Sequence, residues 1–333
     1  MLNWTLRLFS TQEPYLTIAL RNYIFLLIKM NNALLFLVFN RPDTTRKVFN
    51  AIRDAKPPRL YIAADGHRAD HNGEEMLCDE VRRIATSVDW TCEVKTLFRD
   101  KNLGCKNGVS SGIDWFFEHE EQGIILEDDV LPHPDFFTFC DRLLVKYQDD
   151  WRVMMLCGFN PIGADIDSDD YFFSENPCVW GWATWRSRWK LYDLDLKNWP
   201  SELFDTYLKE KFSLPVYTYY KKAFNLTKKG IINSWDYQWT YCLLSNYSLA
   251  IKPCANLVMN IGTEGTHSKR PDHNHFVAYG RMNADKLTCA DIMVPDVRID
   301  NAYYVSRISG GILFYLKRFL KIFIPGSQKQ HSA

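Results

Sequence analysis

The sequence carries no excess of charge of either sign. Its 333 residues include 40 Lys and Arg and 40 Asp and Glu, so the formal net charge is zero. Proteins that bind nucleic acid through their overall electrostatic field are usually strongly basic. We therefore expect no nucleic-acid partner, and we look for function in local groups of residues instead.

The nine cysteines lack the paired spacing that would give them a joint role. Their number is odd, and no two of them form a CxxC pair. Disulfide-stabilised secreted domains and structural zinc sites both depend on such regular spacing. This pattern argues against both classes and favours a protein of the reducing cytoplasm.

The chain also lacks a hydrophobic run long enough to cross a membrane. Near the N-terminus, the apolar run Tyr23–Ile28 is bounded by Arg21 and Lys29. A transmembrane helix needs about 20 apolar residues, and no small-residue cleavage site of a signal peptide follows this run. We expect residues 1–32 to form an arm outside the fold. Residues 1–30 are either an amphipathic segment or an addition from an upstream start codon.

The C-terminal segment 306–333 is predicted to be a basic amphipathic helix and tail. Leu313, Leu316, Leu320 and Phe323 follow helical spacing, with Lys and Arg among them. Such a helix is typical of peripheral contact with a membrane surface, here through residues 312–324 on the inner face of the cytoplasmic membrane. Docking of the helix on its own domain explains the pattern equally well.

Short β-rich runs recur about every thirty residues in the first half of the chain. They cover Ala33–Phe39, Leu60–Asp65, Glu93–Phe98 and Gly123–Leu126. Helix-period segments lie between them, for example the stripe Leu77, Val81, Ile84 and Val88. Alternating strands and helices predict an α/β fold with a Rossmann-like, mostly parallel sheet flanked by helices.

The predicted domain organisation is one domain with two halves. Residues 33–150 form the regular, nucleotide-sugar-binding half, and residues 151–305 form a less regular acceptor-side and catalytic half with no linker between them. Most of the 11 Trp residues lie in the second half. High Trp density is typical of a large core or of a sugar-stacking surface, and composition alone does not separate the two.

Each predicted strand ends in polar residues, and the fourth ends in three acids. Glu127, Asp128 and Asp129 follow the apolar residues Ile124–Leu126 directly. Ligands of parallel α/β sheets bind outside the carboxyl ends of the strands. A solvated turn would explain the triplet, but a hard cation, Mn²⁺ or Mg²⁺, would relieve the repulsion among three buried carboxylates.

The glycine-rich motifs that bind phosphates are absent. The first strand leads into the residues NRPDTT, and neither GxGxxG nor GxxxxGK[ST] occurs anywhere in the chain. These glycine-rich loops are typical of dinucleotide-binding proteins and P-loop enzymes. A metal and diphosphate site without such a loop favours a nucleotide-diphosphate-sugar as the ligand.

The combined motifs resemble a known enzyme family. The segments LVFNRPDTT, LYIAADG, LFRDKNLGCKNG, GIILEDDVLPHPDFF and WGWATWRSRW are similar to those of the nucleotide-diphospho-sugar glycosyltransferases of the GT-A fold. The similarity is greatest to the bacterial family 2-like group with an EDD form of the DxD motif. It covers roughly residues 33–270, while residues 1–32 match nothing in that family.

The resemblance implies a role for each matching position. Nucleotide or donor binding falls to Asn40, Arg41, Asp65, Arg99, Asn102, Gly104, Lys106 and Asp128. Asp129 and His267, in NIGTEGTHS, would ligate the metal, and Glu127 would support them. Structural interpretations stay open: Asp65 as a turn former, and Arg99, Lys106 and His267 as surface residues.

The resemblance also implies a catalytic base and an aromatic wall. Asp236 in SWDYQW matches the catalytic carboxylate of inverting members, and it is equally suited to cap a helix. The segment VWGWATW bends at Gly181 and is expected to leave Trp180 and Trp182 exposed. With Trp185 and Trp235, these rings would line the sugar; plain core packing is the alternative.

The function implied is a metal-dependent, inverting glycosyltransferase of the hexosyl- or N-acetylhexosaminyl-transferase class. It would move a sugar from a nucleotide-diphosphate donor, with UDP favoured, to a glycan or lipid-linked acceptor in surface polysaccharide biosynthesis. One alternative is a sugar-nucleotide pyrophosphorylase, although NRPDTT is not the glycine-rich loop expected there. Another is a non-catalytic module that binds nucleotide-sugars.

Overall fold

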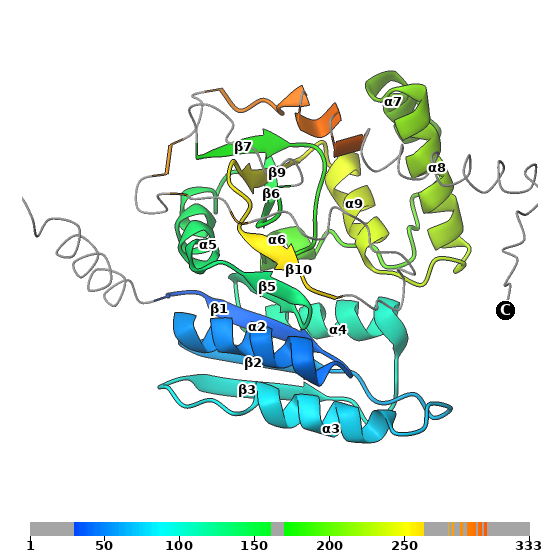
Figure 1. The fold of residues 1–333 in the computed structure, drawn as a ribbon. Helices are drawn as coiled ribbons and strands as arrows, with labels where there is room; N and C mark the ends of the chain where they lie inside the picture. Colours follow the sequence, from blue (N-terminus) through cyan, green and yellow to red (C-terminus); the bar gives the residue numbers. More distant parts are fainter. Residues whose placement is uncertain are drawn as a thin grey trace, which may run out of the picture.

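The computed structural model of the chain describes residues 30–160 and 170–262, together with residues 279, 282, 287–288, 292–297, 299–301 and 303–304. Strands and helices alternate through the first half (Figure 1). The elements of that half are β1 Ala33–Val38, α2 Pro42–Ala55, β2 Arg59–Ala64, α3 Glu74–Ala85, β3 Glu93–Phe98, α4 Gly104–His119, β4 Gln122–Glu127, β5 Val130–Pro132 and α5 Pro134–Lys146. Those of the second half are β6 Val153–Cys157, β7 Tyr171–Ser174, β8 Trp182–Trp185, α6 Arg186–Trp189, α7 Glu202–Lys211, α8 Leu214–Lys228, α9 Asp236–Ser245, β9 Leu249–Pro253 and β10 Val258–Asn260.

Eight strands form one sheet, in the order β3-β2-β1-β4-β8-β6-β9-β7. Strand β1 pairs in parallel with β2 and β4, and β2 pairs in parallel with β3. Strand β8 is antiparallel to both of its neighbours, and β7 is antiparallel to β9. The chain therefore has the predicted α/β fold, with a mostly parallel sheet consistent with a Rossmann-like nucleotide-binding fold.

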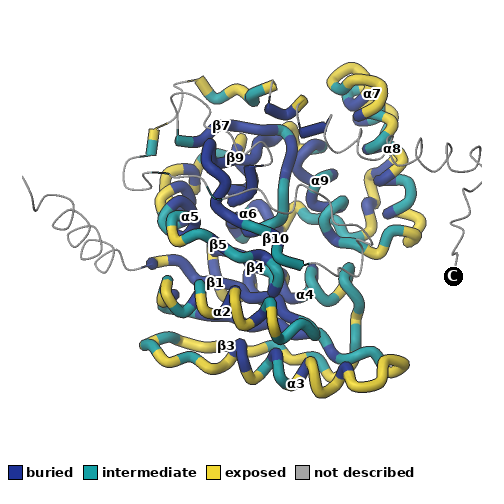
Figure 2. Tube along the Cα trace, in the orientation of Figure 1, coloured by how far each residue is buried: buried dark blue, intermediate teal, exposed yellow. Residues whose placement is uncertain are grey.

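Helices cover both faces of the sheet, which explains the continuous apolar runs in the sequence. All six residues of β1 are buried, and they alternate between two core clusters. Leu34, Phe36 and Val38 pack with residues of α2, α3 and α5, while Ala33, Leu35 and Leu37 pack with residues of α4 and α6–α9. A strand buried on both faces reads as an unbroken hydrophobic run. Figure 2 shows this contrast between β1 and the more exposed edge strand β3.

The expected strands of the first half lie within one residue of the observed bounds. The helical stripe proposed for α3 is partly wrong, because Leu77 is exposed and Val88 lies beyond the end of the helix. Val81 and Ile84 are buried as predicted, and Glu74, Cys78 and Ala85 complete the buried face in place of Leu77 and Val88.

The second half adds strands to the same sheet. Strand β8 lies between β4 of the first half and β6 of the second. A separate two-stranded sheet joins β5, which follows the acidic triplet, to β10 near the end of the continuously described chain. Both connections bring residues far apart in sequence to the carboxyl edge of β4.

Two further expectations concern the ends of the chain and its cysteines. Residues 1–29 and 305–333 lie outside the described residues, so the arm and the basic amphipathic helix remain predictions. None of the helices within the described part is both long and apolar enough to cross a bilayer. The eight cysteines in the described part are free thiols.

Candidate functional site

The strand register brings the polar loops of the first half to one edge of the sheet. Leu37 of β1 lies opposite Glu127 of β4, and Val38 lies opposite Ala64 of β2. Ala64 in turn lies opposite Phe98 of β3. Because the parallel strands end together, the residues that follow them meet at the carboxyl edge, where α/β proteins bind their ligands.

Arg41 and two acids of the triplet form the centre of this edge. The Arg41 guanidinium donates from Nη2 to Asp128 Oδ1 at 2.5 Å and from Nη1 to Asp129 Oδ2 at 2.7 Å. The side chains of Asp128 and Asp129 keep only 3% and 14% of their surface exposed, whereas Arg41 keeps 31%. One cation thus bridges two largely buried carboxylates.

The three acids differ in how well they are paired. Asp128 accepts a further hydrogen bond from the backbone N–H of Phe39, at the end of β1. Within the described part of the chain, no hydrogen bond or ion pair reaches the carboxylate of Glu127. The cluster therefore contains three acidic side chains and a single cation.

The electrostatics reflect this shortage of positive charge. Burial, followed by repulsion from Asp129 and Asp128, raises the pKa of Glu127 to about 8. Burial also raises the pKa of Asp128 to about 6, and the attraction of Arg41 offsets only part of that rise. For Arg41, the acids outweigh the effect of burial and raise the pKa of the guanidinium above its ordinary value.

The chain after β10 passes directly over the cluster. The backbone N–H of Ile261 donates to the carbonyl of Asp129 at 2.7 Å, which extends the pairing of β10 with β5. A Cβ placed on Gly262 would lie 2.5 Å from Asp129 Oδ2 and 3.1 Å from Arg41 Nη1. Only glycine fits here without a shift. Gly262 belongs to the quoted segment NIGTEGTHS, so the glycine-rich loop was the available sequence signal.

Asp65, between β2 and α4, is the centre of a second group of hydrogen bonds, the Asp65 cluster. It accepts hydrogen bonds from the backbone N–H groups of Gly66, Leu103 and Gly104, at 2.9–3.0 Å. Burial raises the pKa of Asp65, and these backbone donors offset only part of the rise. Asp65 therefore satisfies the first N–H groups of α4, and its proposed contact with a nucleotide base is not needed to explain its position.

The other predicted donor-binding residues lie at the same edge, each with a protein partner. Asn102 donates to the carbonyl of Gly66 at 2.7 Å, and Arg99 donates to Ser111 Oγ at 3.1 Å. Lys106 lies 3.5 Å from Asp195, in the second half of the chain. Gly104 has a positive φ of 76°, and a Cβ added to it would lie 3.3 Å from Asn233 Nδ2.

Glu74, a buried residue at the start of α3, was not predicted from the sequence to belong to the site. Asn40 donates to Glu74 Oε1 at 2.8 Å, and Glu74 also accepts from the backbone and the guanidinium of Arg68. Burial opposes ionisation of Glu74, but the hydrogen bonds from Arg68 outweigh it and lower the pKa of that carboxyl. No motif marks these residues, because their contacts arise only when the loop 65–73 folds back towards β1.

Asp236 is the first residue of α9 and lies close to the acidic cluster. Ser234 Oγ donates a hydrogen bond to its carboxylate, and the side chain is partly exposed. Burial raises the pKa of the Cys105 thiol to about 12, and the charges of Glu127 and Asp236 add to the rise. Cys105, near the start of α4, is therefore within electrostatic range of carboxylates from both halves of the chain.

The expectation of an exposed aromatic wall is wrong for most of its members. Trp182 is fully buried, and Trp185 and Trp235 keep only 3% and 2% of their surface exposed. Gly181 does bend the chain, with a φ of 56°, but the bend turns Trp182 into the core. There Trp182 stacks on Trp235 at a centroid distance of 5.6 Å, and Trp239 lies at the same distance. Only Trp180 is partly exposed, against Phe159.

The metal-binding prediction is only partly accessible to the structure. His267 lies outside the described residues. Among the described residues, no group of three or more His, Cys, Asp or Glu side chains is arranged to hold a metal ion by itself. Arg41, rather than a third ligand, takes the free oxygens of Asp128 and Asp129.

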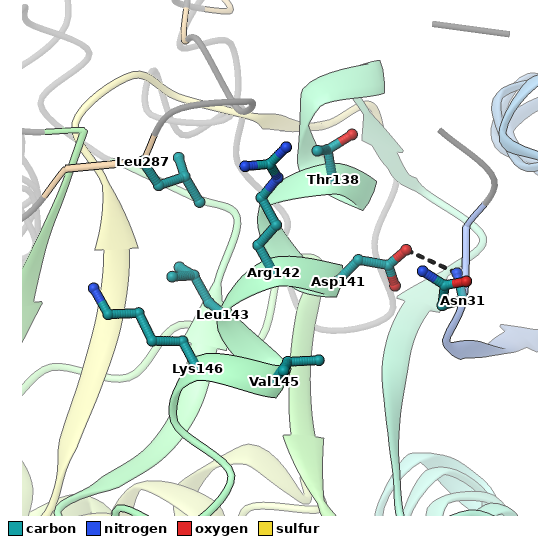
Figure 3. Close-up of a pocket in the computed structure, with 8 residues that line it drawn as sticks. All are labelled: Asn31, Thr138, Asp141, Arg142, Leu143, Val145, Lys146 and Leu287. Atoms are coloured by element: carbon teal, nitrogen blue, oxygen red, sulfur yellow. Dashed lines mark hydrogen bonds between the residues drawn. The ribbon is translucent and has the colours of Figure 1, made fainter. Parts of the chain in front are cut away.

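Two cavities lie away from this cluster. One, of about 510 Å³, lies on the outer face of α5, where Asp141 accepts a hydrogen bond from Asn31 (Figure 3). Asn31 precedes β1, so this cavity belongs to the opposite edge of the sheet from Arg41. The other, of about 420 Å³, lies between α4 and α6 and is lined by Asp114, Trp189 and Tyr192, among others.

Comparisons with known proteins add little beyond the fold. No family model matches the chain, and no curated protein matches it. Among solved structures, the chain is similar to the inositol-1-phosphate CTP transferase from T. maritima, with 13% sequence identity and a TM-score of 0.29. The match covers 66% of this chain and 96% of that one. A similarity at this level says nothing about activity, so a functional proposal has to rest on the geometry and charge of the site.

Proposed function

We propose that the chain is a metal-dependent glycosyltransferase that transfers a sugar from a nucleotide-diphosphate-sugar to a glycan or lipid-linked acceptor. The observation that carries this proposal is the charge of the cluster after β4. Asp128, Asp129 and Glu127 bring up to three negative charges, and Arg41 supplies one positive charge. When all three carboxylates are ionised, the deficit is two charges, which one divalent cation would supply; without a cation, the raised pKa of Glu127 reflects that deficit.

The residues present suit such a cation when a substrate shares it. Magnesium and manganese ions commonly take one or two protein carboxylates and complete their coordination with water and substrate phosphates. The cluster offers two neighbouring aspartates, and Asp129 Oδ1 accepts no hydrogen bond within the described part of the chain. The absence of a three-ligand protein site among the described residues is compatible with this shared arrangement.

Asp129 would hold Mn²⁺ or Mg²⁺, with His267 as a further candidate ligand and Glu127 as support. Asp128, Arg41, Asn40 and the edge residues Arg99, Asn102, Gly104 and Lys106 would bind the donor. When bound, the cation would offset the negative charge that develops on the leaving nucleoside diphosphate. Arg41 would add a planar, two-pronged donor for the diphosphate oxygens.

Asp236 is our candidate for the catalytic base. An acceptor hydroxyl loses its proton as it attacks, so a carboxylate near the sugar is required. Asp236 is partly exposed, is held by Ser234, and is electrostatically linked to Glu127 through the intervening space near Cys105. Inversion at the anomeric carbon rests on the resemblance of the Asp236 segment to the catalytic carboxylate of inverting glycosyltransferases.

Nucleotidyl transfer is the second candidate function. The deficit of positive charge after β4 would also suit the metal and pyrophosphate of a nucleotidyl transfer. The loop after β1 weighs against it, because Arg41 is engaged by Asp128 and Asp129 and the loop has no glycine. A non-catalytic nucleotide-sugar-binding module is the remaining alternative.

Thermal unfolding with UDP, GDP and CMP, each with and without Mn²⁺, separates these candidates. Stabilisation by a nucleoside diphosphate that requires Mn²⁺, followed by hydrolysis of one member of a sugar-nucleotide panel, is the expected result. Stabilisation by CTP with a sugar 1-phosphate, and release of pyrophosphate, would favour nucleotidyl transfer. Binding with no turnover for any donor would favour the non-catalytic module.

The substitution Asp236→Asn tests the base separately. Loss of a general base costs roughly 10²- to 10⁴-fold in rate, and nucleotide binding should stay close to that of the wild type. The matched control is Asp79→Asn on α3, whose side chain is 68% exposed. Unchanged turnover in Asp236→Asn would remove this residue from the mechanism.

A further inference from the structure

Arg41 already binds one carboxylate oxygen of each aspartate at the proposed cation position. Its Nη1 donates to Asp129 Oδ2 at 2.7 Å, and its Nη2 donates to Asp128 Oδ1 at 2.5 Å. In the described part of the chain, Arg41 is the only cation that forms an ion pair with these two aspartates. In the free protein, the Arg41 guanidinium is therefore the counter-ion of both Asp128 and Asp129.

A guanidinium and a divalent cation compete for the same place. Both carry positive charge, and two like charges a few ångströms apart repel by several kcal/mol at the effective dielectric constant of a protein surface. The space is also limited on the other side, because the backbone at Gly262 closes over Asp129 Oδ2. A cation at Asp129 would thus require the Arg41 head group to withdraw from that oxygen.

The local structure allows that withdrawal. The main chain of Arg41 is fixed, since its carbonyl accepts hydrogen bonds from the backbone N–H of Thr45 at 3.0 Å and from Thr45 Oγ1 at 2.6 Å. Its side chain, in contrast, keeps 31% of its surface exposed. The guanidinium can therefore turn about a fixed Cα without any movement of α2.

We propose that Arg41 is an exchangeable counter-ion of the acidic cluster. It neutralises Asp128 and Asp129 in the free protein, and it transfers its hydrogen bonds to the diphosphate of the donor when a divalent cation takes Asp129. This inference rests on the proposed function. The proposal predicts that cation and donor bind cooperatively. The cation displaces Arg41 from the aspartates, and the donor diphosphate gives the displaced guanidinium new hydrogen-bond acceptors.

The test compares Mn²⁺ binding to the wild type, Arg41→Gln and Arg41→Lys without nucleotide. Free Mn²⁺ is followed by electron paramagnetic resonance, and the unfolding midpoint is recorded at each Mn²⁺ concentration. Arg46→Gln, on the same helix and 55% exposed in its side chain, is the matched control. Because of the repulsion it removes, Arg41→Gln should bind Mn²⁺ alone on the order of tenfold more tightly than the wild type.

Two further results are expected. Arg41→Gln should be less stable than the wild type without metal, because Asp128 and Asp129 then lack a counter-ion, and Mn²⁺ should restore more of its midpoint. UDP should raise the Mn²⁺ affinity of the wild type but raise that of Arg41→Gln much less. If Arg41→Gln does not fold without metal, Arg41→Lys keeps the charge without the two-pronged geometry. Its affinity for Mn²⁺ alone should then match that of the wild type, and UDP should raise that affinity less than in the wild type.

The outcomes separate this proposal from the proposed function. Mn²⁺ affinity in Arg41→Gln equal to or below that of the wild type overturns the counter-ion exchange. Where only Arg41→Lys folds, a rise in Mn²⁺ affinity with UDP as large as that of the wild type overturns it. Mn²⁺-dependent binding of UDP to the wild type would still stand in that case. A wild type and variants that bind no Mn²⁺, with or without UDP, would overturn both.

Discussion

Two carboxylate clusters lie at the same edge of the sheet, and they are neutralised in opposite ways. Asp65, after β2, accepts from three backbone N–H groups that cannot leave it. Asp128 and Asp129, after β4, depend on one flexible arginine side chain, and Glu127 has no hydrogen-bond partner in the described part of the chain. The first cluster is complete in the protein alone, and the second is short of positive charge.

This difference indicates which cluster serves the fold and which serves a ligand. Backbone donors are part of the folded chain, so the Asp65 cluster stabilises the start of α4 whether or not a substrate is present. A buried group of acids with too few cations is costly, and such an arrangement persists where a bound ligand removes the cost. The same Asp-to-Asn substitution should therefore have different effects in the two clusters.

The largest difference is expected between Asp129→Asn and Asp65→Asn. Asp129→Asn removes one charge at the proposed cation position, and Mn²⁺-dependent stabilisation by UDP should fall at least tenfold in apparent affinity, which is about 1.4 kcal/mol. Asp65→Asn should leave that affinity within about twofold of the wild type, because its carboxylate contacts backbone N–H groups only. Unfolding midpoints measured over a Mn²⁺ titration with UDP give both values.

Equal losses of Mn²⁺-dependent binding in the two variants would contradict this division of roles. The interpretation would also fail if Asp65→Asn lost nucleotide binding while Asp129→Asn kept it. In that case Asp65 would be the ligand-binding residue, as the resemblance to the glycosyltransferases implies.

A smaller effect is expected on stability without ligands. Asp65→Asn keeps one acceptor oxygen but loses the charge that strengthens its bonds to Leu103 and Gly104, so the free energy of unfolding should fall by about 1 kcal/mol. Urea unfolding of the metal-free protein measures this change. Asp79→Asn on the exposed side of α3 should change it by no more than about 0.5 kcal/mol. A larger loss of unfolding free energy in Asp79→Asn than in Asp65→Asn would contradict this expectation.

The smallest effect is a pH dependence that belongs to the triplet. The pKa of Glu127 is raised from 4.5 in the unfolded chain to about 8 in the fold. Between these values the folded protein holds a proton that the unfolded chain has released, so stability should fall as the pH rises from about 5 to 8. Because Glu127 is partly exposed, the loss should be on the order of 1 kcal/mol.

Glu127→Gln should flatten this part of the pH profile, measured by urea unfolding without metal. Asp65→Asn should leave most of the slope in place between pH 6 and 8. A wild type that becomes more stable over this range would contradict the raised pKa of Glu127.

The first half of the fold could be predicted from the sequence because its signals are local. Apolar strands such as Ala33–Val38 are buried on both faces, and the residues after them reach the carboxyl edge whatever the details of packing. The partners of those residues could not be predicted. The bond between Arg41 and Asp129 joins positions 88 residues apart, and the sequence does not state which cation meets which acid.

The tryptophans show where sequence reasoning lacked information. A Trp beside a glycine bend can face either solvent or core, and the choice depends on what packs against it. For Trp182, the deciding neighbours are Trp235 and Trp239 on and beside α9, more than fifty residues away. These rings meet only through the packing of α9 near β8, which no local pattern in the sequence predicts.

Strand β8 also decides whether the two halves of the chain can exist apart. It pairs with residues Gln122 to Ile125 of β4, which precede it by about sixty positions. A polypeptide cut after α5 would expose the hydrogen-bonding edge of β4, an apolar strand in the middle of the sheet, and such edges recruit other chains. Truncation after residue 150 should thus yield an aggregating fragment rather than a minimal donor-binding unit. Any gene encoding this edge must carry both halves together.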